Sequence, residues 1–241
     1  MRRLEGLDDQ LFLDIQEQLN IEFAAESAIV AHGRVSVAVA IAQARKLLGQ
    51  GKCTYVLIVA TDSLLTWPTL SHYAREDRLL TASNSNGFIP GEGAGALLMG
   101  TPNAPSGDFL CTGIGFSNEA AHIDSGQPLR GNGLTQAMKA ALAEASCEMH
   151  DIDYRISSLS GEQYFFKEAS LALNRTLRKR KEDFDLWHPA ESIGEAGSAS
   201  AIACVALGQA AHAKGYAPGP MPLVHFSNDL GARAVVVLRT S

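Results

Sequence analysis

Two stretches of small apolar residues limit what this chain can fold into more than any other feature of its sequence. The first covers residues 35–48 and the second residues 198–213, and alanine recurs on every side of both. A helix that is apolar on one face covers a core, whereas a helix that is apolar all round lies inside one. Small side chains also allow close packing. The two stretches therefore predict a pair of buried helices sandwiched between two β-sheets.

Each buried helix is followed by apolar runs of strand length. Residues 55–60 and 94–99 follow the first helix, and residues 223–226 and 234–239 follow the second. The run at residues 55–60 is continuous, which is typical of a strand covered on both faces, and the alternation of helix and strand patterns along the chain indicates an α/β fold. The repeated order predicts two similar halves, residues 1–100 and 101–241, that pack as one compact unit. The proline- and glycine-containing segment 100–108 is the seam between them.

Composition excludes several classes of protein. The net charge is −6, which argues against broad nucleic-acid binding. The sequence has no apolar run near the ~20 residues that a membrane helix needs, and its first ten residues turn acidic, unlike a secretory signal. The four cysteines show no metal-binding or redox spacing, so we expect no metal and no cofactor, and reduced thiols in the cytoplasm. These cysteines are Cys53, Cys111, Cys147 and Cys204.

The glycine-rich segment "NGFIPGEGAGALLMG", residues 86–100, has two possible roles. A phosphate-binding loop is one, but no Gly-Lys-Ser/Thr ends the segment, a strand pattern rather than a helix follows it, and Glu92 would repel a phosphate. Close packing of the backbone is the other, because glycine lets neighbouring segments approach. We therefore interpret Gly91, Gly93 and Gly95 as packing residues.

This segment also resembles a strand segment of the β-ketoacyl synthases, which belong to the thiolase-like condensing enzymes. "ESIGEAGSASAIACVAL", with Gly194 and Gly197, is similar to the segment that heads their second buried helix, and "PLVHFSNDLGARAVVVLR" is similar to their final hairpin. The resemblance implies a layered α-β-α-β-α architecture of two similar halves. Family members carry a longer first half, so the resemblance also implies that the N-terminal half is incomplete here.

The family's catalytic residues are a cysteine at the start of the first buried helix and two histidines. The resemblance places Arg34, Ser160 and Glu191 at these three positions. An arginine is not a nucleophile at neutral pH, so the chain is expected to be catalytically inactive. We expect Arg34 and Glu191 to form an ion pair in the former pocket, with a hydrogen bond from Ser160 to Glu191.

Three other polar residues lie near these positions. His32 and His188 are interpreted as loop or surface histidines, and Ser36 as a helix-terminus residue, because no partner group at a known spacing accompanies them.

Two functions follow from the resemblance. One is a protein-binding scaffold or accessory factor, similar to the small ketosynthase-like proteins encoded beside type VI secretion effectors. The alternative is the partner subunit of a ketosynthase, similar to a chain length factor, or an acyl-carrier-protein-dependent acyltransferase of the 3-oxoacyl synthase type in fatty-acid or polyketide synthesis. The expected partner is therefore an effector, a chaperone or a ketosynthase subunit.

Two segments bear on how such a partner would bind. A predicted strand at residues 27–31 would pair two subunits into a homo- or heterodimer. The basic run at residues 175–181 could dock acidic acyl carrier protein, although we interpret it as a solvated helix end.

Overall fold

A computed structural model describes residues 7–102 and 107–240. The chain divides into two compact units, residues 1–31 and residues 32–241. In the first unit, helix α1 (Leu7–Leu19) packs the ring of Phe12 against that of Phe23, with the centroids 4.9 Å apart. The strand predicted at residues 27–31 is not formed. A strand needs a neighbour for its hydrogen bonds, and no described segment pairs with this one.

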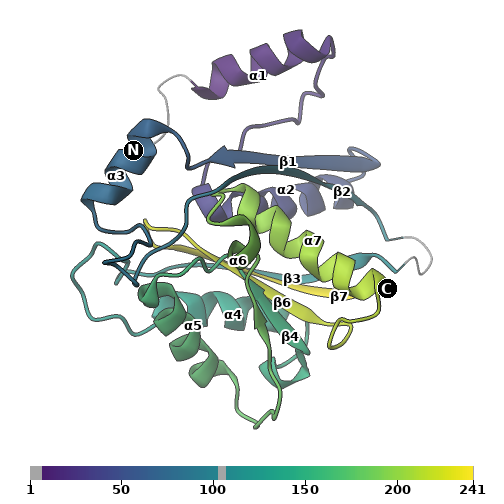
Figure 1. Cartoon of the computed structure of the whole chain (residues 1–241). Coiled ribbons are helices and arrows are strands. Elements are labelled where there is room, and N and C mark those ends of the chain that lie inside the picture. The colour runs from purple at the N-terminus through teal and green to yellow at the C-terminus, as the bar shows by residue number, and fades with distance from the viewer. Residues whose placement is uncertain (1–6, 103–106, 241) are drawn as a thin grey trace. The chain divides into compact units, whose positions relative to one another are not determined.

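The second unit contains two separate sheets (Figure 1). Strands β1 (Tyr55–Ser63) and β2 (Glu92–Gly100) pair antiparallel. The larger sheet has the order β3-β7-β6-β4-β5, in which β4 is parallel to both of its neighbours and the β6–β7 and β3–β7 pairs are antiparallel. Its strands are β3 (Phe109–Asn118), β4 (Tyr154–Ser157), β5 (Leu186–Trp187), β6 (Pro222–Ser227) and β7 (Ala232–Thr240).

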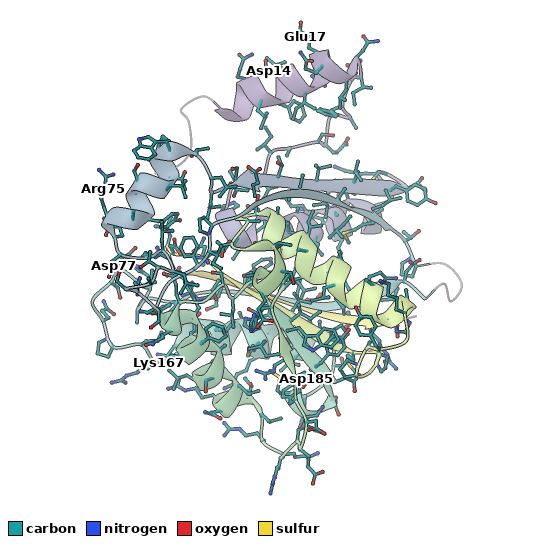
Figure 2. All side chains as sticks on the ribbon, viewed as in Figure 1. Asp14, Glu17, Arg75, Asp77, Lys167 and Asp185 are labelled. Atoms are coloured by element: carbon teal, nitrogen blue, oxygen red, sulfur yellow. The ribbon has the colours of Figure 1, made fainter. Side chains whose placement is uncertain are left out.

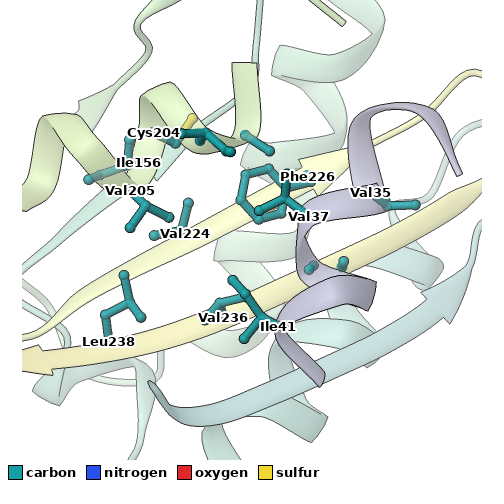
Figure 3. Close-up of a cluster of buried hydrophobic side chains, with 14 of the residues drawn as sticks. Val35, Val37, Ile41, Ile156, Cys204, Val205, Val224, Phe226, Val236 and Leu238 are labelled. Atoms are coloured by element: carbon teal, nitrogen blue, oxygen red, sulfur yellow. The ribbon is translucent and has the colours of Figure 1, made fainter. Parts of the chain in front are cut away.

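The two predicted buried helices lie between these sheets, as expected. They are α2 (Ser36–Gly49) and α7 (Ala199–Ala213), and their side chains share one apolar core with both sheets. Figure 3 shows Ile41 of α2 beside Val236 and Val205 of α7 beside Val224, both partners in the larger sheet. Small residues on the helices allow this close approach, because nothing bulky separates helix from strand.

A second core lies on the other face of the larger sheet. Helices α4 (Asn132–Glu144) and α5 (Gln163–Thr176) cover it, with Met138 and Phe165 packed against Leu223 of β6. On α5, Lys167 points to solvent while its neighbour Glu168 is fully buried (Figure 2). The remaining helices are α3 (Trp67–Arg75) and α6 (Ala190–Ile193), with the 3-10 turns η1 (Gly33–Val35) and η2 (Met149–Asp151).

The second unit is therefore layered as β1–β2, α2–α7, the five-stranded sheet, and α4–α5. This alternation of sheet and helix layers confirms the predicted α/β class. The predicted boundary between residues 100 and 101 falls between the two sheets. The division into two similar halves remains a prediction, because both sheets belong to the same compact unit.

Candidate functional site

The glycine-rich segment crosses the loop between α6 and α7 at very short range. Gly91 donates its N–H to the carbonyl of Glu195 at 2.9 Å, and Glu195 donates its own to the carbonyl of Ile89 at 2.8 Å. A Cβ atom at Gly91 would clash with the carbonyl oxygen of Ile193. Gly194 has a φ of +70°, a conformation that glycine adopts without strain. The crossing thus needs both glycines, and it fixes where Glu195 lies.

The other glycines of the two motifs also lie close to neighbouring segments, either α7 and the loop before it or strand β1. A Cβ atom at Gly95 would approach Ile202 of α7 to 2.8 Å, and one at Gly93 would make only ordinary contact with α7. Gly197 has a φ of +58°, and a Cβ atom there would clash with the carboxylate of Asp62. These contacts support the packing interpretation of the glycines over the phosphate-loop alternative.

Five charged side chains form an alternating row at this crossing, which we call the five-charge network. In order along the row they are Glu195, Arg34, Asp229, Arg78 and Glu162. Arg34 Nη1 is 2.9 Å from Glu195 Oε2, and its Nη2 pairs with Asp229. Arg78 Nη1 is 3.0 Å from Asp229 Oδ2, and Arg78 binds Glu162 through two nitrogens at 2.6 and 2.8 Å. Each arginine therefore sits between two carboxylates.

The five residues come from five different segments. Arg34 belongs to η1, immediately before α2, and Glu195 precedes α7. Asp229 lies in the turn between β6 and β7, Arg78 follows α3, and Glu162 is the residue before α5. The network therefore joins both buried helices to the loops at one end of the larger sheet.

Burial and charge act in opposite directions on the two arginines. The side chains of Arg34 and Arg78 are only 10% and 11% exposed. Burial by itself lowers the pKa of each guanidinium, but the adjacent carboxylates raise the pKa more, so the net shift is upward. Both arginines stay positively charged. The Phe165 ring lies 4.7 Å from Cζ of Arg34, and the Tyr73 ring lies 5.1 Å from Cζ of Arg78, in cation–π geometry.

The sequence placed Arg34 correctly but not its partner. Glu191 lies on the short helix α6 with its side chain 74% exposed, where it pairs with Nδ1 of His188 at 3.3 Å. The expected Arg34–Glu191 pair is therefore wrong, and Glu195 takes that place. Ser160 Oγ is buried and has no hydrogen-bond partner among the described residues, so the expected bond to Glu191 is not made either.

Four members of the network, Glu195 among them, were not anticipated from the sequence. Arg78, Glu162 and Asp229 belong to no motif, and isolated charges in loops are usually solvated. Two residues considered near Arg34 are also placed. His32 is exposed, and the hydroxyl of Ser36, at the first position of α2, accepts a hydrogen bond from the backbone N–H of His32 at 2.8 Å.

None of the five network side chains carries a thiol, hydroxyl or imidazole, and the hydroxyl of Ser200 donates a hydrogen bond to Glu195 Oε1 at 3.4 Å. Burial raises the pKa of Cys111, Cys147 and Cys204, which makes these thiols poor nucleophiles. The described residues hold no cluster of three or more potential metal ligands. Among the helices at residues 7–102 and 107–240, none has the length and apolar character to cross a bilayer.

Comparison with known proteins identifies the fold. No protein-family model and no curated protein sequence matches this chain. Several solved structures, in contrast, match it. A chain of the complex of the ketosynthase ApeO with its chain length factor ApeC from Xenorhabdus doucetiae superposes with a TM-score of 0.81 at 17% identity, over 98% of this chain and 65% of that one.

Two further structures show the same fold. The AntDE:AntF complex, a type II polyketide synthase acyl carrier protein with its ketosynthase, matches with a TM-score of 0.76 at 16% identity, covering 95% of this chain and 66% of that one. A β-ketoacyl synthase from Burkholderia phymatum also gives 0.76, at 15% identity, with coverages of 95% and 64%. The chain has the thiolase-like ketosynthase fold, and it spans about two thirds of the length of these solved chains.

Proposed function

We propose that this chain is a non-catalytic, protein-binding subunit with a ketosynthase fold, which assembles with a catalytic ketosynthase as a chain length factor does. The observation that carries the proposal is the five-charge network. It includes Arg34, the residue that the resemblance sets at the position of the catalytic cysteine, and it joins Arg34, just before the first buried helix, to Glu195, just before the second.

The chemistry of the network supports inactivity. Condensation begins with transfer of an acyl group to a nucleophile, and a guanidinium whose pKa is raised by two carboxylates cannot supply one. Opening the network to admit a substrate would leave buried charges without partners, at a cost of several kcal/mol. We infer that the former catalytic position is used to hold the buried helices in place.

The similar structures support the proposed partner, because two of them are complexes of a ketosynthase with a chain length factor or with acyl carrier protein. The basic run offers a place for a carrier protein. The helix α5 ends at Thr176, and the following Arg178, Lys179 and Arg180 are exposed. In an accessory role with type VI secretion effectors the chain is equally non-catalytic, and only its protein partner differs. We propose that either role is exercised in the cytoplasm, the kind of compartment in which cysteines stay reduced.

Intact-mass spectrometry tests inactivity. The full chain is incubated with acyl-CoA and with acyl-loaded carrier protein, alongside a catalytic ketosynthase as a positive control. We expect no acyl adduct on this chain. A stoichiometric adduct on residues 28–36, or release of carbon dioxide from malonyl-loaded carrier protein, would contradict the proposal.

Co-expression with ketosynthases from the source organism tests the partner. We expect one ketosynthase to co-purify in a fixed ratio and to condense acyl chains only when this chain is present. Full activity of every ketosynthase without this chain would overturn the assignment as a partner subunit.

A further inference from the structure

The face of the β1–β2 sheet that points away from α2 and α7 is apolar and exposed. We call it the outer face, and it consists of Tyr55, Leu57, Val59, Ala94, Ala96 and Leu98. Leu57 and Leu98 are register partners and are 62% and 68% exposed, and Val59 is 64% exposed. No charged residue interrupts this patch. A contiguous apolar surface of this kind marks an interaction site in a soluble fold.

The second half of the chain shows what covers the corresponding face. Strands β6 and β7 form the same antiparallel pair beside the buried helices, with Leu223 opposite Val237 where the first sheet has Leu57 opposite Leu98. Leu223 and Val237 are fully buried, in the core beneath α4 and α5. The pair Leu57 and Leu98 and the pair Leu223 and Val237 occupy corresponding places in the two halves of the chain. The first pair is exposed, whereas the second is buried.

The edges of the two sheets differ in the same way. The edge of β7 away from β6 pairs antiparallel with β3, and the edge of β6 away from β7 pairs parallel with β4. Among the described residues β1 and β2 pair as strands only with each other, so each keeps one edge without a strand partner. Proteins protect such edges with lysine, proline or a covering element. Residues 55–60 and 93–99 contain neither lysine nor proline, which leaves a covering element.

We propose that the outer face and the free edge of β2 dock a strand–helix segment of a different protein. Its strand adds antiparallel to β2, and its helix lies on Leu57, Val59 and Leu98 with an uncharged face of small and aliphatic residues. This inference rests on the proposed function, because it names the surface through which the partner binds. It also replaces the dimer contact expected at residues 27–31, where no strand forms.

The choice of a strand–helix segment rests on how β3 and α4 cover β7. Strand β3 pairs with β7, and α4 packs so closely on β3 that a Cβ atom at Gly113 or Gly115 would clash with the helix backbone. Together, β3 supplies hydrogen-bond partners to the edge of β7, and α4 covers the face of the sheet. The solved ketosynthase-fold chain described above is longer than this one, which spans 65% of it, so that fold accommodates additional elements.

A second copy of this chain fits the surface less well. Six small or medium side chains at roughly two-thirds exposure offer a few hundred Å² per copy, short of the about 800 Å² per partner in a stable interface. Face-to-face stacking of two copies would also leave all the strand edges unpaired. A partner that supplies a strand pairs with the free strand edge, and its helix adds the buried area that a second copy lacks.

Site-specific photocrosslinking tests the proposal with the full chain in its native host. Leu57→p-benzoylphenylalanine and Leu98→p-benzoylphenylalanine place the photoreactive group on the outer face. Leu230, 78% exposed in the turn between β6 and β7, carries the same group as the control. After irradiation, the crosslinked peptides are identified by mass spectrometry.

We expect both outer-face positions to crosslink to one segment of one different protein, with the alternating pattern of a strand followed by an amphipathic helix. Adding Leu57→Glu to the chain that carries the photoreactive group at position 98 should lower the crosslinking yield by about tenfold, because one interface anchor is lost. Leu230→Glu should leave that yield unchanged, and both variants should melt like the parent because both side chains are exposed.

Crosslinks to a second copy, to residues 1–31 of the same chain, or to scattered peptides would overturn the proposal, and so would the absence of any crosslink. The two proposals fail separately. If the crosslinked strand–helix segment belongs to a protein unrelated to condensing enzymes, the docking surface stands and the ketosynthase-partner function does not.

Discussion

Arg34 and Glu195 are joined by an ion pair of 2.9 Å although 161 residues separate them in the chain, and their side chains are only 10% and 4% exposed. One residue stands just before α2 and the other just before α7. The pair therefore ties together the starts of the two helices on which both sheets pack. Its geometry makes this position a structural joint.

Replacing one partner of this joint should cost much more than replacing both. Arg34→Met leaves Glu195 and part of Asp229 buried without a counter-charge, so we expect the free energy of unfolding to fall by about 3 kcal/mol or more. Adding Glu195→Gln to the same chain should cost less than the sum of the two single variants. Urea unfolding measures all three.

The control for this series is Arg45→Met. Arg45 pairs with Glu144 at 2.8 Å, but their side chains are 32% and 42% exposed, so the loss should stay within about 1 kcal/mol. Equal losses for Arg34→Met and Arg45→Met would show that the five-charge network does not stabilise the fold.

Two glycines of one motif should respond differently to alanine. Gly91→Ala forces a Cβ atom against the carbonyl of Ile193, where only backbone can give way, so we expect a loss of about 1–3 kcal/mol. Gly93→Ala meets the nearest atom of α7 at 3.6 Å and should change stability by less than about 1 kcal/mol. Thermal unfolding of both variants decides the matter, and a tolerated Gly91→Ala would contradict the crossing described here.

His225 should make the protein less stable as the pH falls. Burial, with a smaller contribution from Arg155, lowers the pKa of His225 to about 3, against about 6.5 in an unfolded chain. Between these two values the unfolded state binds a proton that the folded state does not. Stability is therefore complete above about pH 6.5 and declines below it, by up to about 1.4 kcal/mol per pH unit.

Urea unfolding between pH 5 and pH 7 measures this slope. His225→Asn should flatten it, whatever its effect on stability at neutral pH. If His225→Asn and the parent chain lose stability in parallel on acidification, the assignment of the slope to His225 is wrong.

The amino-acid sequence by itself determined the two buried helices and the alternation of helix and strand. Residues 198–213 are apolar all round and residues 35–48 nearly so, and such helices are stable where sheets cover them. The apolar segments at residues 223–226 and 234–239 became the buried strands β6 and β7. The expectation of a doubly covered strand was wrong at residues 55–60, because one face of β1 is exposed. The successful predictions depend on composition that is contiguous in the chain, whereas the cover of a strand's second face comes from another segment.

Only the tertiary structure decided which charges meet. Glu191 and Glu195 are four residues apart, and one is exposed on α6 while the other is buried against Arg34. The difference arises at Gly194, whose positive φ and contact with residues 89–91 turn the chain inward. The predicted strand at residues 27–31 failed for a related reason, since a strand exists only where another segment supplies its hydrogen bonds. Partners of this kind come from segments far apart in the sequence, so no local pattern encodes them.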